Sequence, residues 1–452
     1  MMRIGNLRGR ISAFALAALL PLAFAACSDR GVQPVAPEQE AAALAPLVPR
    51  SDGLHCTDSL ATLSSGAPYQ VCVNLAKWNG DIVAFIPGYH DPAREPRLPD
   101  VFGESPAVSV FSQLGYAFAT TGFHDTGLIE SHTWIDGDLL ELITTAKAQL
   151  TSASGRSSRF VYQAGGSQGG LGTVMAVERY PSTFHGGLAA CGPIGDYRRQ
   201  INFVADFRVV FDHMFKDVIP GWPVWKQDLA AGDPGAIDPT TWQAVQPLAS
   251  AALDDPANAD RLRQILAVTR APTDPANPLT MKGTTLGILW YSFRGTNDAI
   301  QKLGGSPFGN LDRAYAGSFD DVALNAGVQR FQYTADPARV AGLQTSARLL
   351  RPLVTIHTTG DPIVPVSHQP LYRSRLSIFG RLLHTPLTIE RYGHCEFNAA
   401  EVLAAFAILV LKVSGQELLV SNEVSNEVLP SAQEGQFLRL AREHGANPVI
   451  VR

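Results

Sequence analysis

The chain has 452 residues, of which 46% are hydrophobic and 17% charged, so it is long and apolar enough to bury a large globular core. Its formal net charge is −5. Removing residues 1–26, which contain three arginines and no acid, leaves 33 basic and 41 acidic residues, a net charge of −8 with neutral histidines. This acidic balance, with no basic blocks, argues against nucleic acid as a partner.

The first 26 residues have the pattern of a bacterial export signal. Three arginines precede an apolar stretch that is too short to span a membrane and that ends in small residues. The run Phe24-Ala25-Ala26-Cys27 resembles a lipoprotein processing site, at which Cys27 is lipidated. We therefore expect an exported protein anchored to the outer membrane by its N-terminal lipid. The alternative is ordinary cleavage nearby, which gives a periplasmic or extracellular protein. Residues 27–53, rich in Pro, Ala, Glu and Gln, are predicted to form a flexible tether.

Export gives the remaining cysteines an oxidising environment. Cys56, Cys72, Cys191 and Cys395 are an even number and allow three disulfide connectivities. We favour a bond between Cys56 and Cys72, which are close in sequence and flank an early turn. Buried free thiols are the alternative interpretation.

Strand and helix patterns alternate along residues 54–195. In chain order we expect strands over 69–73 and 81–86 joined as a hairpin at Asn79-Gly80, a helix over 106–114, a strand over 116–121, a helix over 136–150, a strand over 159–164, a helix that ends before Pro181, and a strand over 184–190. Such alternation predicts an α/β fold in which a mostly parallel sheet is covered by helices on both faces.

The alternation stops over residues 196–350, which are rich in amphipathic helical segments and aromatic residues. We interpret this stretch as a mainly helical cap inserted into the sheet domain. The sheet domain resumes over 351–415, with strands at 351–357 and 386–390 and helices at 367–378 and 399–413. Residues 416–452 are polar, and we expect only a C-terminal tail there.

The run Gly165-Gly166-Ser167-Gln168-Gly169-Gly170 lies between a predicted strand and a predicted helix. A strand, a tight glycine-lined turn with serine at its apex, and a helix form the nucleophile elbow of serine hydrolases. The chain contains a near repeat, Gly304-Gly305-Ser306-Pro307-Phe308. That repeat lacks the final glycine and the preceding strand, so we expect a loop there.

A serine hydroxyl needs a base to take its proton, and the base needs an acid that fixes its tautomer. Asp361 directly follows one predicted strand, and His394 directly follows the last one. We therefore expect Ser167, His394 and Asp361 to form a catalytic triad. Asp196, which follows an earlier strand, is the alternative acid.

The order Ser167, Asp361, His394 resembles that of the alpha/beta-hydrolase superfamily, over residues 69–196 and 351–413. The resemblance implies that Ser167 attacks a carbonyl carbon, His394 transfers the proton and Asp361 orients the imidazole. It also implies an oxyanion hole made by the backbone N–H of Gln168 and by that of Tyr89, which follows Pro87-Gly88 where the family often has His-Gly. No metal or organic cofactor is expected.

The run Gly393-His394-Cys395 also resembles the tannase and feruloyl-esterase branch of that superfamily. In that branch a cysteine beside the nucleophile forms a disulfide with the cysteine beside the histidine. Gly166 occupies the position beside the nucleophile here, so this bond cannot form. Cys191 ends the next strand at the same edge of the sheet, and we expect it to pair with Cys395 instead.

These features predict a secreted serine hydrolase that cleaves carboxylic esters, small or polymeric, through an acyl-enzyme. The aromatic residues of the cap suggest an apolar or aromatic group in the substrate. The alternatives are a serine peptidase of the same fold and a surface binding protein without catalysis. The sequence leaves the natural ester and the oligomeric state open.

Overall fold

The structure is a computed structural model that describes residues 44–451, except 59–60, 93, 97, 99–106, 217 and 219–238. The predicted export signal, Cys27 and residues 27–43 of the predicted tether lie outside the described residues.

A sheet of nine strands forms the centre of the described chain. The strands are β1 (Val48–Pro49), β2 (His55–Cys56), β3 (Tyr69–Val73), β4 (Ile82–Ile86), β5 (Ala117–Thr121), β6 (Val161–Gly166), β7 (Gly186–Ala190), β8 (Leu353–Gly360) and β9 (His384–Tyr392). Their order in space is β1-β2-β3-β5-β4-β6-β7-β8-β9. The pairs from β5 through β9 are parallel, and the pairs from β1 to β5 are antiparallel. The expectation of a mostly parallel sheet is confirmed.

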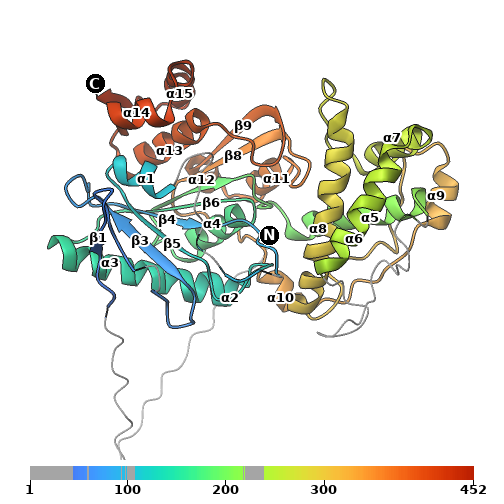
Figure 1. The fold of residues 1–452 in the computed structure, drawn as a ribbon, viewed down its shortest axis with the longest axis horizontal. Helices are drawn as coiled ribbons and strands as arrows, with labels where there is room; N and C mark the ends of the chain where they lie inside the picture. The colour runs from blue at the N-terminus through green and yellow to red at the C-terminus, as the bar shows by residue number, and fades with distance from the viewer. Residues whose placement is uncertain are drawn as a thin grey trace, which may run out of the picture. The chain divides into compact units, whose positions relative to one another are not determined.

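Helices cover both faces of this sheet (Figure 1). Helices α3 (Leu140–Ser154), α4 (Gln168–Arg179) and α11 (His368–Arg375) pack on one face, and α1 (Ala107–Gln113) and α13 (Ala399–Ser414) on the other. Residues of β4 alternate between the two cores, Ile82 and Ala84 facing the first and Val83 the second. This period of two, in a strand apolar on both sides, is typical of a sheet buried on both faces. The architecture is that of the alpha/beta-hydrolase fold.

The chain between β7 and β8 forms a separate group of helices, which Figure 1 shows beside the sheet. They are α5 (Tyr197–Met214), α6 (Pro239–Asp254), α7 (Ala259–Thr269), α8 (Leu279–Leu303), α9 (Asp321–Gly327) and α10 (Pro337–Ala341). Buried aromatic side chains, such as Phe207, Phe211 and Phe293, belong to an apolar core shared mainly by these helices. The near repeat of the serine motif at residues 304–308 lies in the loop after α8, as expected.

The predicted hairpin at Asn79-Gly80 is wrong. Strand β5 lies between β3 and β4, and β4 is hydrogen-bonded to β5 and β6, both parallel to it. The segment from Asn74 to Asp81 therefore carries the chain past the position of β5. A turn signal reports the local backbone bend, but it does not say which strands will pair.

Two predicted boundaries also need correction. Within the expected tether, Val48–Pro49 forms β1 and pairs with β2, so the sheet domain begins before residue 54. The expected tail contains α14 (Asn422–Val428) and α15 (Ser431–Glu443), together with β10 (Leu419–Ser421) and β11 (Val449–Val451), which pair in parallel. Apolar residues of this region, including Phe437, are buried against the same core as α13.

Helix 399–413 of the sequence prediction corresponds to α13, which is buried along one face of the sheet. Within the described part of the chain, none of the helices combines the length and the apolar character needed to cross a bilayer.

Candidate active site

Ser167 lies at the sharp turn between β6 and α4. Its backbone has φ 57° and ψ −124°, a conformation that residues other than glycine adopt only at a cost in free energy. The turn packs tightly on the end of β4. A Cβ atom at Gly165 would lie 2.8 Å from the carbonyl oxygen of Ile86, and one at Gly169 would lie 2.7 Å from that of Pro87. Both distances are too short for any side chain, so the glycines of the motif allow the turn to form.

His394 and Asp361 complete a chain of hydrogen bonds from the serine. The Nε2 atom of His394 lies 2.9 Å from Ser167 Oγ, and its Nδ1 atom lies 2.8 Å from Asp361 Oδ2. A carboxylate at Nδ1 stabilises the tautomer that carries the proton on Nδ1 and leaves Nε2 free to accept the serine proton. The ends of β6, β8 and β9 bring the three residues together because all three strands point the same way.

Asp361 is completely buried and fully hydrogen-bonded. Its Oδ1 atom accepts the backbone N–H groups of Ile363 and Val364, both at 2.9 Å. Burial alone would raise the pKa of this carboxyl, but hydrogen bonds from His357 and His394 outweigh burial and lower the pKa below its usual value. Asp361 is therefore ionised at neutral pH, as a partner of the imidazolium must be.

The alternative acid, Asp196, has another role. Its carboxylate caps the N-terminus of α5 by accepting the backbone N–H of Arg198 at 2.9 Å, and it accepts a second hydrogen bond from Gln344 at 3.1 Å. His357, to which sequence reasoning gave no role, donates from Nε2 to the carbonyl oxygen of Val364 at 2.8 Å and lies 3.4 Å from Asp361 Oδ2. It thus supports the loop that holds the acid.

The structure contains both favoured disulfide bonds, Cys56–Cys72 and Cys191–Cys395. The second joins the end of β7 to the residue after His394, with 5.4 Å between the Cα atoms. A Cβ atom at Gly166 would lie 3.8 Å from Cys395 Sγ and 3.9 Å from Cys191 Sγ. The two sulfur atoms also lie near His394, but they are bonded to each other and so are not free as thiolate ligands for a metal.

The two residues expected to supply oxyanion donors, Gln168 and Tyr89, line the same cavity as Ser167. Gln168 is the first residue of α4, so its backbone N–H has no carbonyl partner within the helix. The backbone of Gly88 lies directly against the nucleophile, since a Cβ atom built there would be 3.5 Å from Ser167 Cβ. This contact brings the following residue, Tyr89, into the wall of the cavity above Ser167.

The side chain of Gln168 has a second role, which sequence reasoning missed. Its amide oxygen accepts the backbone N–H of Ile129 at 3.0 Å, and its amide nitrogen donates to the carbonyl oxygen of Gly127 at 2.9 Å. The residue after the nucleophile therefore clamps the loop after β5 on both sides of Leu128. A glutamine in this position carries no sequence signal for such a contact, because its partners are 39 and 41 residues away.

A cavity of about 100 Å³ opens at Ser167 between the sheet domain and the helices inserted after β7. Core residues Leu128 and Ile363 line it together with residues of α5 and α8. Its other lining residues are Tyr89, Ser167, Gln168, Pro193, Tyr197, Gln200, Ile201, Val204, Ala205, Tyr291, Gly295, Thr296, Ala299, Pro307, Phe308 and Val364. Among the described residues, no Asp, Glu, Lys or Arg contributes to this lining.

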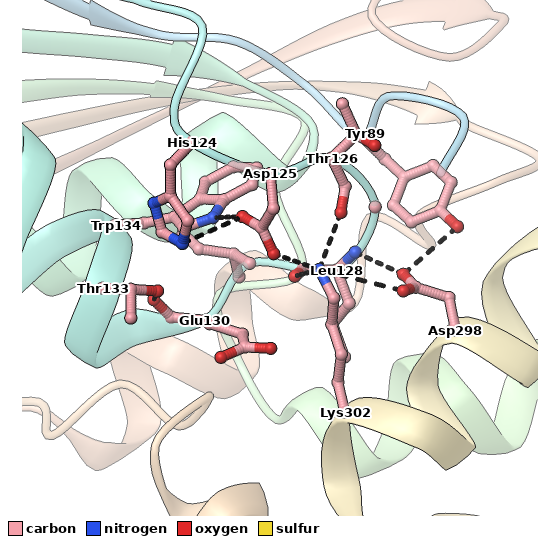
Figure 2. A network of polar contacts seen from close by, with 12 residues as sticks. Tyr89, His124, Asp125, Thr126, Leu128, Glu130, Thr133, Trp134, Asp298 and Lys302 are labelled. Carbon is pink, nitrogen blue, oxygen red and sulfur yellow. Dashed lines mark hydrogen bonds and ion pairs between the residues drawn. The ribbon is translucent and has the colours of Figure 1, made fainter. Parts of the chain in front are cut away.

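A polar network connects α8 to the two loops beside the serine (Figure 2). The carboxylate of Asp298 accepts the backbone N–H of Leu128, and its Oδ2 atom lies 3.5 Å from the hydroxyl of Tyr89. One turn further along α8, Lys302 donates to the Asp125 carboxylate at 2.9 Å and to the carbonyl oxygens of Thr126 and Leu128 at 2.7 and 2.9 Å. Sequence reasoning also missed this network.

The sheet, the covering helices and the elbow define the chain as a protein of the alpha/beta-hydrolase fold. No protein-family model matches the sequence, and no curated protein matches it either. Solved structures with a similar arrangement include feruloyl esterase B from Aspergillus oryzae, at 14% identity and TM-score 0.43, covering 76% of this chain and 73% of the other. Tannin acyl hydrolase from Aspergillus niger matches at 12% identity and TM-score 0.40, covering 81% of this chain and 78% of the other. An acylaminoacyl peptidase from Pyrococcus horikoshii matches at 10% identity and TM-score 0.34, covering 73% of this chain and 35% of the other.

Proposed function

We propose that the protein is a secreted serine hydrolase that cleaves carboxylic esters through an acyl-enzyme. The observation that supports this most directly is the continuous chain of hydrogen bonds from Ser167 Oγ through His394 to Asp361. A buried, ionised aspartate, an imidazole with a free Nε2 and a serine at a strained turn are the parts that acyl transfer requires.

In the proposed reaction, His394 Nε2 takes the proton of Ser167 as Oγ attacks the ester carbonyl carbon. The backbone N–H groups of Gln168 and Tyr89 donate to the oxyanion of the tetrahedral intermediate. His394 then returns the proton to the departing alcohol, which leaves an ester between the acyl group and Ser167. Water, whose proton His394 takes, then attacks the acyl carbon. The bond to Oγ breaks, the carboxylic acid is released, and His394 returns the proton to Ser167.

The lining of the cavity favours an uncharged ester over a peptide as the substrate. A peptidase that binds a free amino terminus needs an acidic group in its pocket, and a substrate carboxylate needs a cation. The described lining offers neither, and consists of apolar side chains with tyrosine, glutamine and threonine groups. The peptidase remains the second candidate, because the same triad cleaves amides. Faster turnover of amino-acid anilides than of aryl esters would show that the protein is a peptidase and not an esterase.

Labelling with a fluorophosphonate probe tests the central proposal, since the probe phosphonylates only an activated serine. The wild-type protein should be labelled, and the Ser167→Ala variant should not. Ser306→Ala, in the near repeat of the motif, is the matched control and should be labelled like the wild type. Absence of wild-type labelling, or labelling of Ser167→Ala, would show that the proposal is wrong.

Secretion and lipid anchoring are part of the proposal, and they rest on the N-terminal sequence and on the two disulfides. Partitioning of the full chain into a detergent phase tests the anchor. A Cys27→Ala variant should move to the aqueous phase; if it still partitions into detergent, lipidation at Cys27 is excluded.

A further inference from the structure

Helix α8 contacts both loops that flank Ser167, and it does so through one buried carboxylate. Asp298 is 7% exposed, and it accepts the backbone N–H of Leu128 while facing the Tyr89 hydroxyl. Figure 2 shows the carboxylate between these two groups, with Lys302 on the same helix. The approach is close: a Cβ atom at Gly127 would overlap the Asp298 carboxylate. Only glycine fits at position 127 with Asp298 in this position.

Each of the two residues that Asp298 contacts, Tyr89 and Leu128, is connected to the nucleophile through a neighbouring residue. Tyr89 follows Gly88, whose backbone lies against Ser167, and Tyr89 supplies one of the proposed oxyanion donors. Leu128 lies between Gly127 and Ile129, the two residues whose backbones are clamped by the Gln168 side chain. Gln168 supplies the other proposed donor. A path of hydrogen bonds and backbone contacts therefore runs from Asp298 to both sides of the serine.

We propose that Asp298 is a positioning residue for the Ser167 site, which acts from α8 by holding Tyr89 and Leu128 and through them the two oxyanion donors. This inference rests on the proposed function. It assigns to the helices inserted after β7 a second task besides forming the wall of the cavity: they set the geometry in which the transition state is stabilised.

The charges around Asp298 make this contact dependent on pH. The titratable groups that face the carboxylate are Lys302, with Nζ at 3.8 Å from Oδ1, Asp125, and the hydroxyls of Tyr89 and Tyr197. Burial raises the pKa of Asp298 to about 6, and Lys302 and the Leu128 N–H only partly offset this. Asp298 is therefore ionised at neutral pH and becomes protonated in mild acid, where it is a weaker acceptor.

The test compares wild type with Asp298→Asn, which keeps the size of the side chain and removes its charge. Displacing an oxyanion donor raises the free energy of the transition state more than that of the bound substrate, so kcat should fall and KM should change little. Complete loss of one donor reduces kcat by about 100-fold to 1000-fold, and a displaced donor should reduce it by about tenfold. The acid limb of the kcat/KM profile should also lose one protonation step near pH 6.

Thermal unfolding at pH 8 separates positioning from a purely structural role. An ionised carboxylate whose pKa is raised in the folded state destabilises that state above pH 6, so its replacement by a neutral amide should not lower the Tm at pH 8. A purely structural residue would give the reverse result, with a lower Tm and an unchanged pH profile. Asp254→Asn is the matched control, since Asp254 lies on α6, is 59% exposed and pairs with Lys282.

A second variant covers the case in which Asp298→Asn does not fold. Tyr89→Phe removes only the hydroxyl that faces Asp298 and should lower kcat several-fold. Two results together overturn the inference: a folded Asp298→Asn or Tyr89→Phe variant keeps kcat within twofold of wild type, and Asp298→Asn keeps the acid limb of the kcat/KM profile. Fluorophosphonate labelling distinguishes this failure from that of the proposed function: an unlabelled wild type contradicts the serine hydrolase, whereas equal labelling rates of wild type and Asp298→Asn contradict only the role of Asp298.

Discussion

Replacement of Asp361 by asparagine should abolish nearly all activity without unfolding the protein. The two oxygens of Asp361 are not equivalent. Oδ1 accepts the backbone N–H groups of Ile363 and Val364 and lies 3.0 Å from Nδ1 of His394, whereas Oδ2 has neither backbone donor and lies closer to that nitrogen, at 2.8 Å. In the variant, the amide oxygen must stay with the two N–H donors, since the alternative orientation would place an NH₂ group against both of them. The introduced NH₂ group then faces His394.

That orientation forces the wrong tautomer on the histidine. Nδ1 of His394 must now accept a hydrogen bond from the introduced amide, so its proton moves to Nε2, which faces Ser167 Oγ at 2.9 Å. A protonated Nε2 cannot take the serine proton. The same exchange in a serine protease triad lowers kcat by about 10⁴-fold, and we expect a loss of that order here, equivalent to about 5 kcal/mol in the activation free energy.

The assay is the turnover of an aryl ester at pH 7.5 by wild type, Asp361→Asn and Asp196→Asn, with circular dichroism as the check on folding. Asp196→Asn is the control because Asp196 is the other strand-end acid of the sequence and caps α5, so it should keep wild-type kcat within about twofold and lose at most about 1 kcal/mol of stability. Retention of more than a tenth of wild-type kcat by a folded Asp361→Asn variant would refute the tautomer argument.

Two further predictions concern the backbone around the site. Gly169→Ala should fail to give a folded, labelled protein, because its Cβ would collide with the carbonyl groups of Ile86 and Pro87. The control is Gly435→Ala, at a helical site with nothing within 4 Å, which should stabilise the protein by about 0.5–1 kcal/mol. A folded and active Gly169→Ala variant would show that the elbow tolerates a wider turn. Removal of the Cys191–Cys395 bond, which spans 204 residues, should lower the free energy of unfolding by about 5 kcal/mol and should also lower kcat. Removal of the Cys56–Cys72 bond, which spans 16 residues, should lower the free energy of unfolding by about 3 kcal/mol and leave kcat nearly unchanged. Urea unfolding and ester turnover measure the two quantities, and equal effects of both removals on kcat would contradict a role of the first bond at the site.

The sequence predicted the parts of the fold that depend on local pattern and on strand direction. Most strand positions followed from short apolar runs between turn residues, and the elbow followed from glycines that a tight strand-to-helix turn requires. The approach of Asp361 and His394 to Ser167 followed from topology, because the carboxyl ends of parallel strands meet at one edge. None of these inferences required knowledge of a distant side-chain contact.

The errors concern contacts between distant segments. Asn79-Gly80 predicted a bend, but the insertion of β5 beside β4 depends on a strand 30 or more residues further on. The region after residue 416 is polar on average, yet Val424 and Val428, and likewise Phe437 and Ala441, are spaced four residues apart and buried on the core. That spacing is a signal of helices with one apolar face, which the average composition conceals. Asp298 carried no such signal, because its contacts are with loops that fold opposite α8.

The disulfide beside the active site joins two residues that have positive φ, Cys191 and Cys395. Cys191 and Cys395 have φ of 45° and 57°, and Ser167 also has φ 57°. Each such residue costs about 1–2 kcal/mol and persists only where its surroundings fix it. A Cβ atom at Gly166 would point at both sulfur atoms, so the bridge fills the space that a side chain beside the nucleophile would occupy. In this chain the sulfur atom that bonds Cys395 comes from the residue after β7. Because β7 runs parallel to β6 and ends level with Gly166, the residue that follows β7, Cys191, lies at the same edge of the sheet as the nucleophile.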